Sequence, residues 1–138
     1  IIVDYLQYVK VAQDGRKLEN RRLEVEEVSR NLKNLARELD VPILALAQLS
    51  REVEGRANHR PQLSDLREAG GIEQDCDGAM FLYPDPNASP DDPSRNVDLL
   101  IEKHRNGARG VVQLHYIGAY TRFYPRTDGT PLSRPQGD

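Results

Sequence analysis

The chain begins with an apolar, β-branched run that ends in a single carboxylate. Ile1, Ile2 and Val3 directly precede Asp4, and a second apolar run follows at Val41–Ala47. Short continuous runs of this kind are typical of strands buried in a parallel sheet. Because parallel neighbours need a long crossover, a strand, a helix and a strand within the first 47 residues predict a βαβ unit. The expected fold class is therefore α/β.

The segment between the two apolar runs has a helical pattern. We expect Gln13–Lys17 to form a loop and a helix to begin near Asn20, which is a suitable N-cap. Four apolar residues then fall at the spacing of one helix face. They are Val28, Leu32, Leu35 and Leu39.

The second half of the chain alternates short apolar segments with polar connections. Residues 48–65 are polar and Arg-rich and predict a long loop. The further elements that we expect are a short helix at Gly71–Asp75, a strand at Gly78–Tyr83, an exposed connection at Pro84–Arg95, a β-hairpin formed by Val97–Glu102 and Gly110–Tyr116, and a last strand at Tyr120–Tyr124. The Pro/Gly-rich tail, residues 125–138, is expected to be disordered.

Composition narrows the classes of protein. The chain has 138 residues, enough for one domain with a core, and we interpret it as a piece of a longer protein because it begins inside a strand. No apolar run approaches the roughly 20 residues that cross a bilayer. The net charge of −3 restricts any contact with nucleic acid to a local surface. The lone Cys76, which we expect to pack as an ordinary side chain, fits a reducing compartment such as the cytoplasm.

Two polar residues follow the two predicted parallel strands. Asp4 comes after the first strand and Gln48 after the second, so the two would lie side by side if the strands are neighbours. In P-loop nucleotide hydrolases an Asp in this place helps to hold Mg²⁺. A neutral amide there can sense a γ-phosphate or position a water molecule. The alternatives are a solvated Asp and an ordinary polar strand end.

Two further segments combine cations with turn-forming residues. Asp65–Gly71 contains Arg67 and two consecutive glycines, and exposed backbone N–H groups with an arginine can follow a phosphate backbone. Glu102–Arg109 contains the hairpin signal Asn106-Gly107, which projects Lys103 and Arg105 from a strand end. Two such cations can reach one anion, as an arginine finger does. The alternatives are a surface loop of mixed charge and a solvated basic tip.

Other common sites are not supported. His59, His104 and His115 are scattered without metal-ligand spacing, so a metal site made by protein side chains alone is not expected. The tyrosines are dispersed, so an aromatic platform for stacked bases is not supported either.

Several stretches taken together resemble the C-terminal RecA-like motor domain of the DnaB family of replicative DNA helicases. They are Ile1–Gln7, Ser29–Leu39, Val41–Arg51, Arg60–Asp77, Met80–Tyr83, Ile101–Gly107 and Thr121–Phe123. The resemblance covers about residues 1–124. It implies a mostly parallel sheet with a terminal antiparallel β-hairpin, as in the C-terminal part of a RecA-like P-loop NTPase fold.

The resemblance also implies roles for single residues. Asp4 matches the Walker B aspartate that supports Mg²⁺, and Gln48 matches the glutamine that links the γ-phosphate to the DNA-binding loops. The loop positions that hold DNA in the central channel correspond to Arg67, Glu68 and Gly70. Lys103 and Arg105 match the finger pair that reaches the ATP of the neighbouring subunit. His104 stands where the family commonly has a neutral amide, which puts its own contact with ATP in doubt.

For the protein as a whole, the resemblance implies a homohexamer that uses ATP and Mg²⁺ to move on single-stranded DNA, with primase and a helicase loader as partners. The 138 residues contain no G-x-x-x-x-G-K-[ST] P-loop. We therefore expect the isolated chain to be inactive as an ATPase. Two alternatives stay open: another RecA-like ATPase, and a non-catalytic fragment that serves only in assembly.

Overall fold

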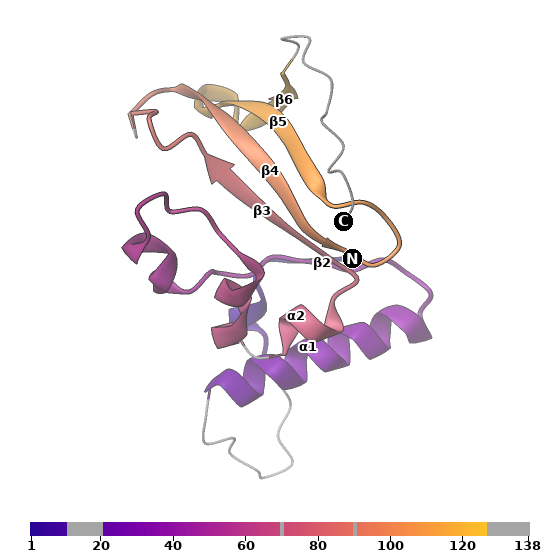
Figure 1. Ribbon diagram of the computed structural model, residues 1–138. Coiled ribbons are helices and arrows are strands. Elements are labelled where there is room, and N and C mark those ends of the chain that lie inside the picture. The colour runs from indigo at the N-terminus through magenta and orange to yellow at the C-terminus, as the bar shows by residue number, and fades with distance from the viewer. Residues whose placement is uncertain (11–20, 70, 90, 127–138) are drawn as a thin grey trace. The chain divides into compact units, whose positions relative to one another are not determined.

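The computed structural model of the chain describes residues 1–10, 21–69, 71–89 and 91–126. The chain divides into two compact units (Figure 1). Unit 1 comprises Ile1–Arg56 and Gln62–Cys76, and unit 2 comprises Ala57–Pro61 and the chain from Asp77 onward. The predictions for Gln13–Lys17, for Asn20 and for most of the tail lie outside the described residues.

Unit 1 contains the predicted βαβ arrangement. Strand β1 (Ile2–Val3) pairs in parallel with β2 (Leu44–Ala45), and α1 (Arg21–Glu38) lies between them in sequence. The ladder extends beyond these short strands, because the Leu46 N–H donates to the Val3 carbonyl oxygen at 2.9 Å. The 3₁₀ helix η1 (Leu6–Tyr8) follows β1 directly.

The core of unit 1 lies between α1 and one face of this strand pair. Its buried cluster consists of Leu6, Val25, Val28 and Ile72, with Leu32, Ala45 and Ala47 packed against it. The alternate residues Leu44 and Leu46 are 51% and 43% exposed, and Ile2 is 72% exposed. The expectation of strands buried on both faces is therefore wrong for the described residues, because elements among them cover only one face.

The predicted apolar face of α1 is confirmed for Val28 and Leu32 and is wrong for the last two of its four residues. Val28 is buried, whereas Leu35 and Leu39 are exposed. The helix ends in a Schellman arrangement, in which the Val41 N–H donates to the Ala36 carbonyl oxygen at 3.1 Å and Asp40 has a φ of 50°. This left-handed residue turns the chain directly toward β2, which explains the short connection.

The predicted long loop after β2 contains short helices. The 3₁₀ helix η2 (Arg51–Gly55) is capped by Ser50, whose hydroxyl accepts from the Glu52 N–H at 3.2 Å. A second 3₁₀ helix, η3 (Leu63–Ala69), is followed by α2 (Ile72–Asp75), which agrees with the short helix predicted there. Helices of one or two turns are too short for a sustained apolar repeat, so the polar composition concealed η2 and η3.

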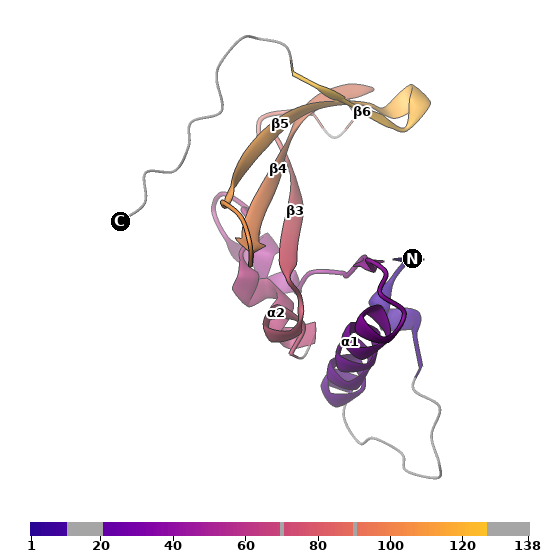
Figure 2. The same ribbon diagram turned by 90° about the vertical axis from the view of Figure 1, so that its right-hand side faces the viewer.

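Unit 2 is built on an antiparallel sheet with the order β3-β4-β5-β6 (Figure 1, Figure 2). Its strands are β3 (Gly78–Pro84), β4 (Ser94–His104), β5 (Gly110–Ile117) and β6 (Arg122–Pro125), with the 3₁₀ helix η4 (Gly118–Tyr120) before β6. Its strands bury Phe81 and Leu100, which lie opposite each other in the register, and also Ala79 and Val97. The predicted hairpin and the strand before it are therefore confirmed, with β4 starting inside the predicted connection.

The expectation of a mostly parallel sheet is not supported by the described part of the chain. Two of its strands pair in parallel, and four pair antiparallel. The difference follows from the connections, because the short turn between β4 and β5 cannot make the crossover that a parallel pair requires. None of the described helices is both long enough and apolar enough to span a membrane.

Candidate functional site

Asp4 leaves β1 at the carboxyl edge of the parallel pair. Val3 lies opposite Ala45 in the register, so the residues after both strands emerge at the same edge. The Leu6 N–H donates to the Leu46 carbonyl oxygen at 2.8 Å, which carries the pairing past Asp4. The Asp4 side chain is exposed to solvent. The predicted pairing of the two strands is thus confirmed.

Gln48 is held at this edge by the side chain of Gln7. The Gln7 amide donates to the Gln48 carbonyl oxygen at 3.1 Å, and its own oxygen accepts from the Gln48 N–H at 3.3 Å. The side-chain amide thereby replaces a strand backbone at the point where η1 bends away. This pair satisfies both backbone polar groups of Gln48 and leaves the exposed Gln48 side chain available for another contact.

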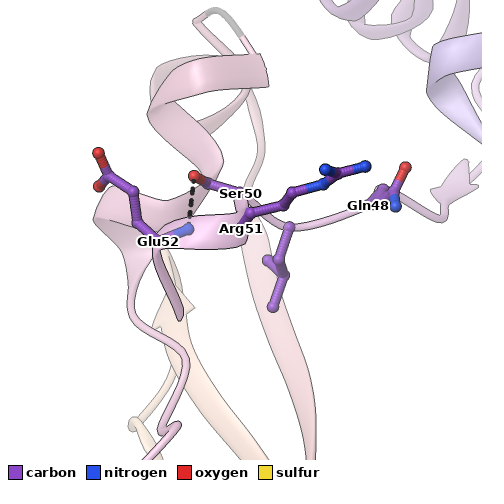
Figure 3. Close-up of a pocket in the computed structure, with 5 residues that line it drawn as sticks. Gln48, Ser50, Arg51 and Glu52 are labelled. Carbon is purple, nitrogen blue, oxygen red and sulfur yellow. Dashed lines mark hydrogen bonds between the residues drawn. The ribbon is translucent and has the colours of Figure 1, made fainter. Parts of the chain in front are cut away.

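The residues after Gln48 form an open hollow of about 390 Å³ (Figure 3). Gln48, Leu49, Ser50, Arg51 and Glu52 line it. Figure 3 shows the Arg51 side chain extending toward Gln48, whereas Glu52 points the opposite way. The side of the hollow next to Gln48 therefore presents an amide and a guanidinium, both of which can donate to an anion.

The environment of Asp4 suits an ion that arrives with a nucleotide. Mg²⁺ in nucleotide sites is bound by one or two carboxylates together with phosphate oxygens, and Asp4 supplies one such carboxylate. In the described part of the chain, no three His, Cys, Asp or Glu side chains converge to hold a metal ion.

Two tyrosines follow Asp4. The ring centroids of Tyr5 and Tyr8 lie 4.4 Å apart, and a hydrogen bond with Tyr8 raises the pKa of the Tyr5 phenol.

The segment predicted to contact DNA begins in η3. Arg67 and Glu68 belong to this 3₁₀ helix, which ends at Ala69, so the expected open loop is helical up to that point. Gly70 and the side chains of Arg67 and Glu68 lie outside what the structure describes. The roles of these three residues therefore stay predictions.

An ion pair joins η3 to the segment that follows Gln48. Arg56 donates to both carboxylate oxygens of Asp65, at 2.8 and 2.5 Å, and the Gln62 N–H donates to the same carboxylate at 2.7 Å. The Asp65 side chain is 1% exposed and that of Arg56 is 27% exposed. Hydrogen bonding from Arg56 holds the pKa of Asp65 below its usual range, against the opposing effect of burial. The Ser50 N–H also donates to the Asp65 carbonyl oxygen at 3.3 Å.

The predicted finger residues lie at one end of the sheet of unit 2. Lys103 is near the end of β4 and is half-buried, and Arg105 follows the strand and is exposed. Arg105 is bound to Asp77, which precedes β3. Its N–H donates to the Asp77 carbonyl oxygen at 2.8 Å, and its Nη1 donates to Asp77 Oδ1 at 2.6 Å.

His104 packs against the turn of the hairpin. A Cβ atom on Gly107 would clash with Cε1 and Nδ1 of the His104 ring, so only glycine leaves room for the imidazole in this position. The His104 ring thus occupies space over its own turn. This placement gives no support to a contact between His104 and ATP, and that contact stays a prediction.

Sequence reasoning assigned no role to Gln7, Arg56 and Asp77. Gln7 lies within the quoted stretch Ile1–Gln7, and its position three residues after Asp4 was the available signal. The partners of Arg56 and Asp77 lie 9 and 28 residues away along the chain. No periodic pattern predicts these two pairs, because the residues are brought together by connections whose path has no regular repeat.

Solved structures define the class of the fold. The chain matches one structure that is described as an ATPase domain, with a TM-score of 0.79 and 43% identity, over 91% of this chain and 43% of that one. It also matches a structure of a DnaB-like replicative helicase and its interactions with primase, with a TM-score of 0.77 and 44% identity, over 88% of this chain and 29% of that one.

The chain belongs to the family described as DnaB-like helicase C terminal domain, whose sequence profile matches residues 1–125. It is 51% identical over 124 residues to the replicative DNA helicase DnaB of Geobacillus stearothermophilus, and 47% identical over 124 residues to the replicative DNA helicase DnaC of Bacillus subtilis. Each match covers 89% of this chain and 27% of the relative. The chain thus spans about a quarter of the length of these relatives.

Proposed function

We propose that this chain is the C-terminal portion of the RecA-like motor domain of a hexameric replicative DNA helicase. In this function, ATP hydrolysis drives translocation on single-stranded DNA and unwinding of the duplex at the replication fork. The observation that carries the proposal is the family match over residues 1–125. The geometry of Asp4 and Gln48 at one strand edge supports it, because open α/β sheets bind ligands outside the carboxyl ends of their strands.

The nucleotide edge performs two tasks in this proposal. The Asp4 carboxylate supports Mg²⁺, which neutralises charge on the phosphates when it is bound with ATP. The Gln48 side chain contacts the γ-phosphate or the attacking water. Because Gln7 fixes the Gln48 peptide, the loss of the γ-phosphate changes the side chain's contacts without releasing the backbone from the sheet edge.

The route from nucleotide to DNA is short. Ser50 and Arg56 flank η2 on the chain that follows Gln48, and both contact Asp65. Asp65 precedes Arg67 by two residues. A shift that begins at Gln48 therefore has a bonded path to Arg67, Glu68 and Gly70, which hold the DNA backbone in this proposal. Contacts with the phosphate backbone bind the DNA strand independently of its base sequence.

Hydrolysis requires a neighbouring subunit. Lys103 and Arg105 project toward the ATP bound by the next protomer, where the guanidinium stabilises charge on the transferred phosphoryl group. His104 is the least supported member of this group because its ring packs over Gly107. A homohexameric ring supplies one finger to each site, which makes assembly a condition of activity.

The proposed ligands and partners follow from the family. They are ATP, Mg²⁺, single-stranded DNA, further copies of the chain, primase and a helicase loader, all of which would meet in the cytoplasm. The support for primase is a structural relative whose description includes interactions with primase. Another RecA-like ATPase does not account for a DnaB-type match over residues 1–125. A fragment that acts only in assembly stays the competing proposal, because the 138 residues contain no P-loop.

Substitution of the finger tests the proposal in the complete polypeptide that carries this chain. Arg105→Ala is expected to leave ATP binding intact and to reduce hydrolysis at least about 10²-fold, because a finger contributes about 10³ to 10⁵ in rate. Arg109→Ala is the matched control, since it removes an exposed cation from the same hairpin connection. A loss of only a few-fold for Arg105→Ala, or an equal loss for both variants, would remove Arg105 from this role.

A further inference from the structure

Arg105 is attached to Asp77 at two points within unit 2. One is a backbone hydrogen bond of 2.8 Å, and the other joins Arg105 Nη1 to Asp77 Oδ1 at 2.6 Å. In the register of the sheet, Gly78 lies opposite His104, so Asp77 and Arg105 flank the last paired position. The backbone bond continues the strand pairing, and the carboxylate adds a second contact that favours one direction of the guanidinium.

The geometry leaves most of the guanidinium available. Among the described residues, Arg105 has only the two contacts with Asp77, so its remaining guanidinium N–H groups point to no protein acceptor. The guanidinium is a planar fork with five donors. It can therefore keep Asp77 on one side while it donates to a phosphate oxygen on another.

The pair is weak enough to permit exchange. The side chains of Arg105 and Asp77 are 46% and 57% exposed. An ion pair this exposed contributes little to stability. The contact therefore biases the orientation of Arg105 without locking it, and a multiply charged triphosphate can draw the guanidinium toward itself.

We propose that Asp77 is a positioning residue for the Arg105 finger and holds the guanidinium pre-oriented for the nucleotide of the neighbouring subunit. This inference rests on the proposed function, because it needs Arg105 to act on ATP in trans. Asp77 does not touch ATP in this role. It lowers the cost of ordering Arg105 in the transition state, and such ordering contributes to rate rather than to substrate affinity.

Four variants of the complete polypeptide test the proposal by steady-state ATPase kinetics, with hexamer formation checked by size. Asp77→Ala is expected to lower kcat by about 3- to 5-fold, the largest effect that a contact this exposed can have, while KM for ATP stays within about 2-fold. Asp77→Asn keeps an oxygen acceptor of the same size and is expected to lose less activity. Asp91→Ala is the control, since it removes an exposed carboxylate from the same unit, and it is expected to keep kcat. The fourth variant combines Asp77→Ala with Arg105→Ala.

The double variant separates positioning from an unrelated structural effect. If Asp77 acts through Arg105, adding Asp77→Ala to Arg105→Ala lowers kcat by no more than about 2-fold. Independent, multiplicative losses would overturn the proposal, as would a kcat for Asp77→Ala equal to that of the control while Arg105→Ala is impaired. If Arg105→Ala itself keeps normal hydrolysis, the finger assignment fails first and the role of Asp77 fails with it.

Discussion

The ion pair between Arg56 and Asp65 gives the sharpest test of how unit 1 is held together. Arg56→Met removes the guanidinium and keeps an unbranched side chain. In the described structure, the Asp65 carboxylate then retains only the Gln62 N–H as a hydrogen-bond donor. The side chain of Asp65 is 1% exposed, so water cannot replace the lost partner without local rearrangement.

The magnitude follows from the burial of the two partners. Removing one member of a fully buried pair costs about 3–5 kcal/mol. Arg56 is 27% exposed, which reduces the cost, and each hydrogen bond to a charged group contributes about 1.5–3 kcal/mol. We expect Arg56→Met to lower the opening free energy of the segment from Ser50 to Leu66 by about 2–3 kcal/mol at pH 7. Adding Asp65→Asn should recover about 1 kcal/mol or more, because a neutral amide is less costly to bury than a lone charge.

The loss of opening free energy caused by Arg56→Met should become smaller as the pH falls. Arg56 lowers the pKa of Asp65 below the unfolded value of about 3.9, so this stabilisation is present above about pH 4 and is lost as pH falls through the lower folded pKa. Without Arg56, burial outweighs the Gln62 N–H and raises the pKa of Asp65 in the folded state, so protonation then stabilises the variant. The difference between wild type and Arg56→Met should therefore shrink as pH falls from 7 toward 4.

Amide hydrogen exchange of peptides that cover Ser50–Leu66 measures the opening free energy, after correction for intrinsic rates at each pH. Arg30→Met is the matched control, since the Arg30–Glu26 pair on α1 has an N···O distance of 3.2 Å and side chains that are 63% and 35% exposed. It should cost no more than about 0.5 kcal/mol. An equal cost for Arg56→Met and Arg30→Met, or no recovery with Asp65→Asn, would refute the reasoning.

Two further predictions concern the nucleotide edge and the DNA segment. Gln7→Ala removes two hydrogen bonds to the Gln48 backbone, together about 1–2 kcal/mol. It should reduce the stimulation of ATPase by single-stranded DNA at least about 5-fold with little change in ATP affinity, and unchanged stimulation would contradict the role of Gln7. Arg67→Ala should weaken single-strand binding and flatten the slope of log affinity against log salt by about 0.7 for one lost phosphate contact, and an equal slope in the variant would argue against that contact.

The regular elements were the most predictable part of this fold. The hairpin was located because Asn106-Gly107 interrupts two apolar runs, and the parallel pairing because an amphipathic helix separates two others. Burial was less predictable. Leu35 and Leu44 look like core residues in sequence, yet they are exposed because elements among the described residues cover only one side of their surroundings. The sequence pattern indicates which side chains are able to be buried. Whether they are buried depends on whether another helix or strand packs over them.

The candidate residues at the ends of strands could be predicted from the sequence. The supporting residues in the 3₁₀ helices and connections could not. Asp4 and Gln48 could be paired because parallel strands end at a common edge. The supporting contacts of Gln7, Arg56 and Asp77 depend on the path of η1, η2 and the hairpin, which no periodicity specifies. The candidate side chains were thus visible in the sequence, whereas the side chains that support them were visible only in three dimensions.

The proposed function gives a physical reason why some candidate residues lie at strand ends and others lie in 3₁₀ helices. In the proposed function, Asp4 and Gln48 keep their positions through every cycle, and a strand ladder closed by the Gln7 amide would provide that rigidity. In the same proposal, the segment between Gln48 and Arg67 moves, and 3₁₀ turns suit this because their hydrogen bonds have poorer geometry than those of an α-helix. The Arg56–Asp65 pair then sets how far such a movement travels, because it ties the two turns into one body. We therefore expect that a variant without the pair would let η2 shift without η3, and that it would uncouple the proposed nucleotide site from the proposed DNA segment while both kept their residues.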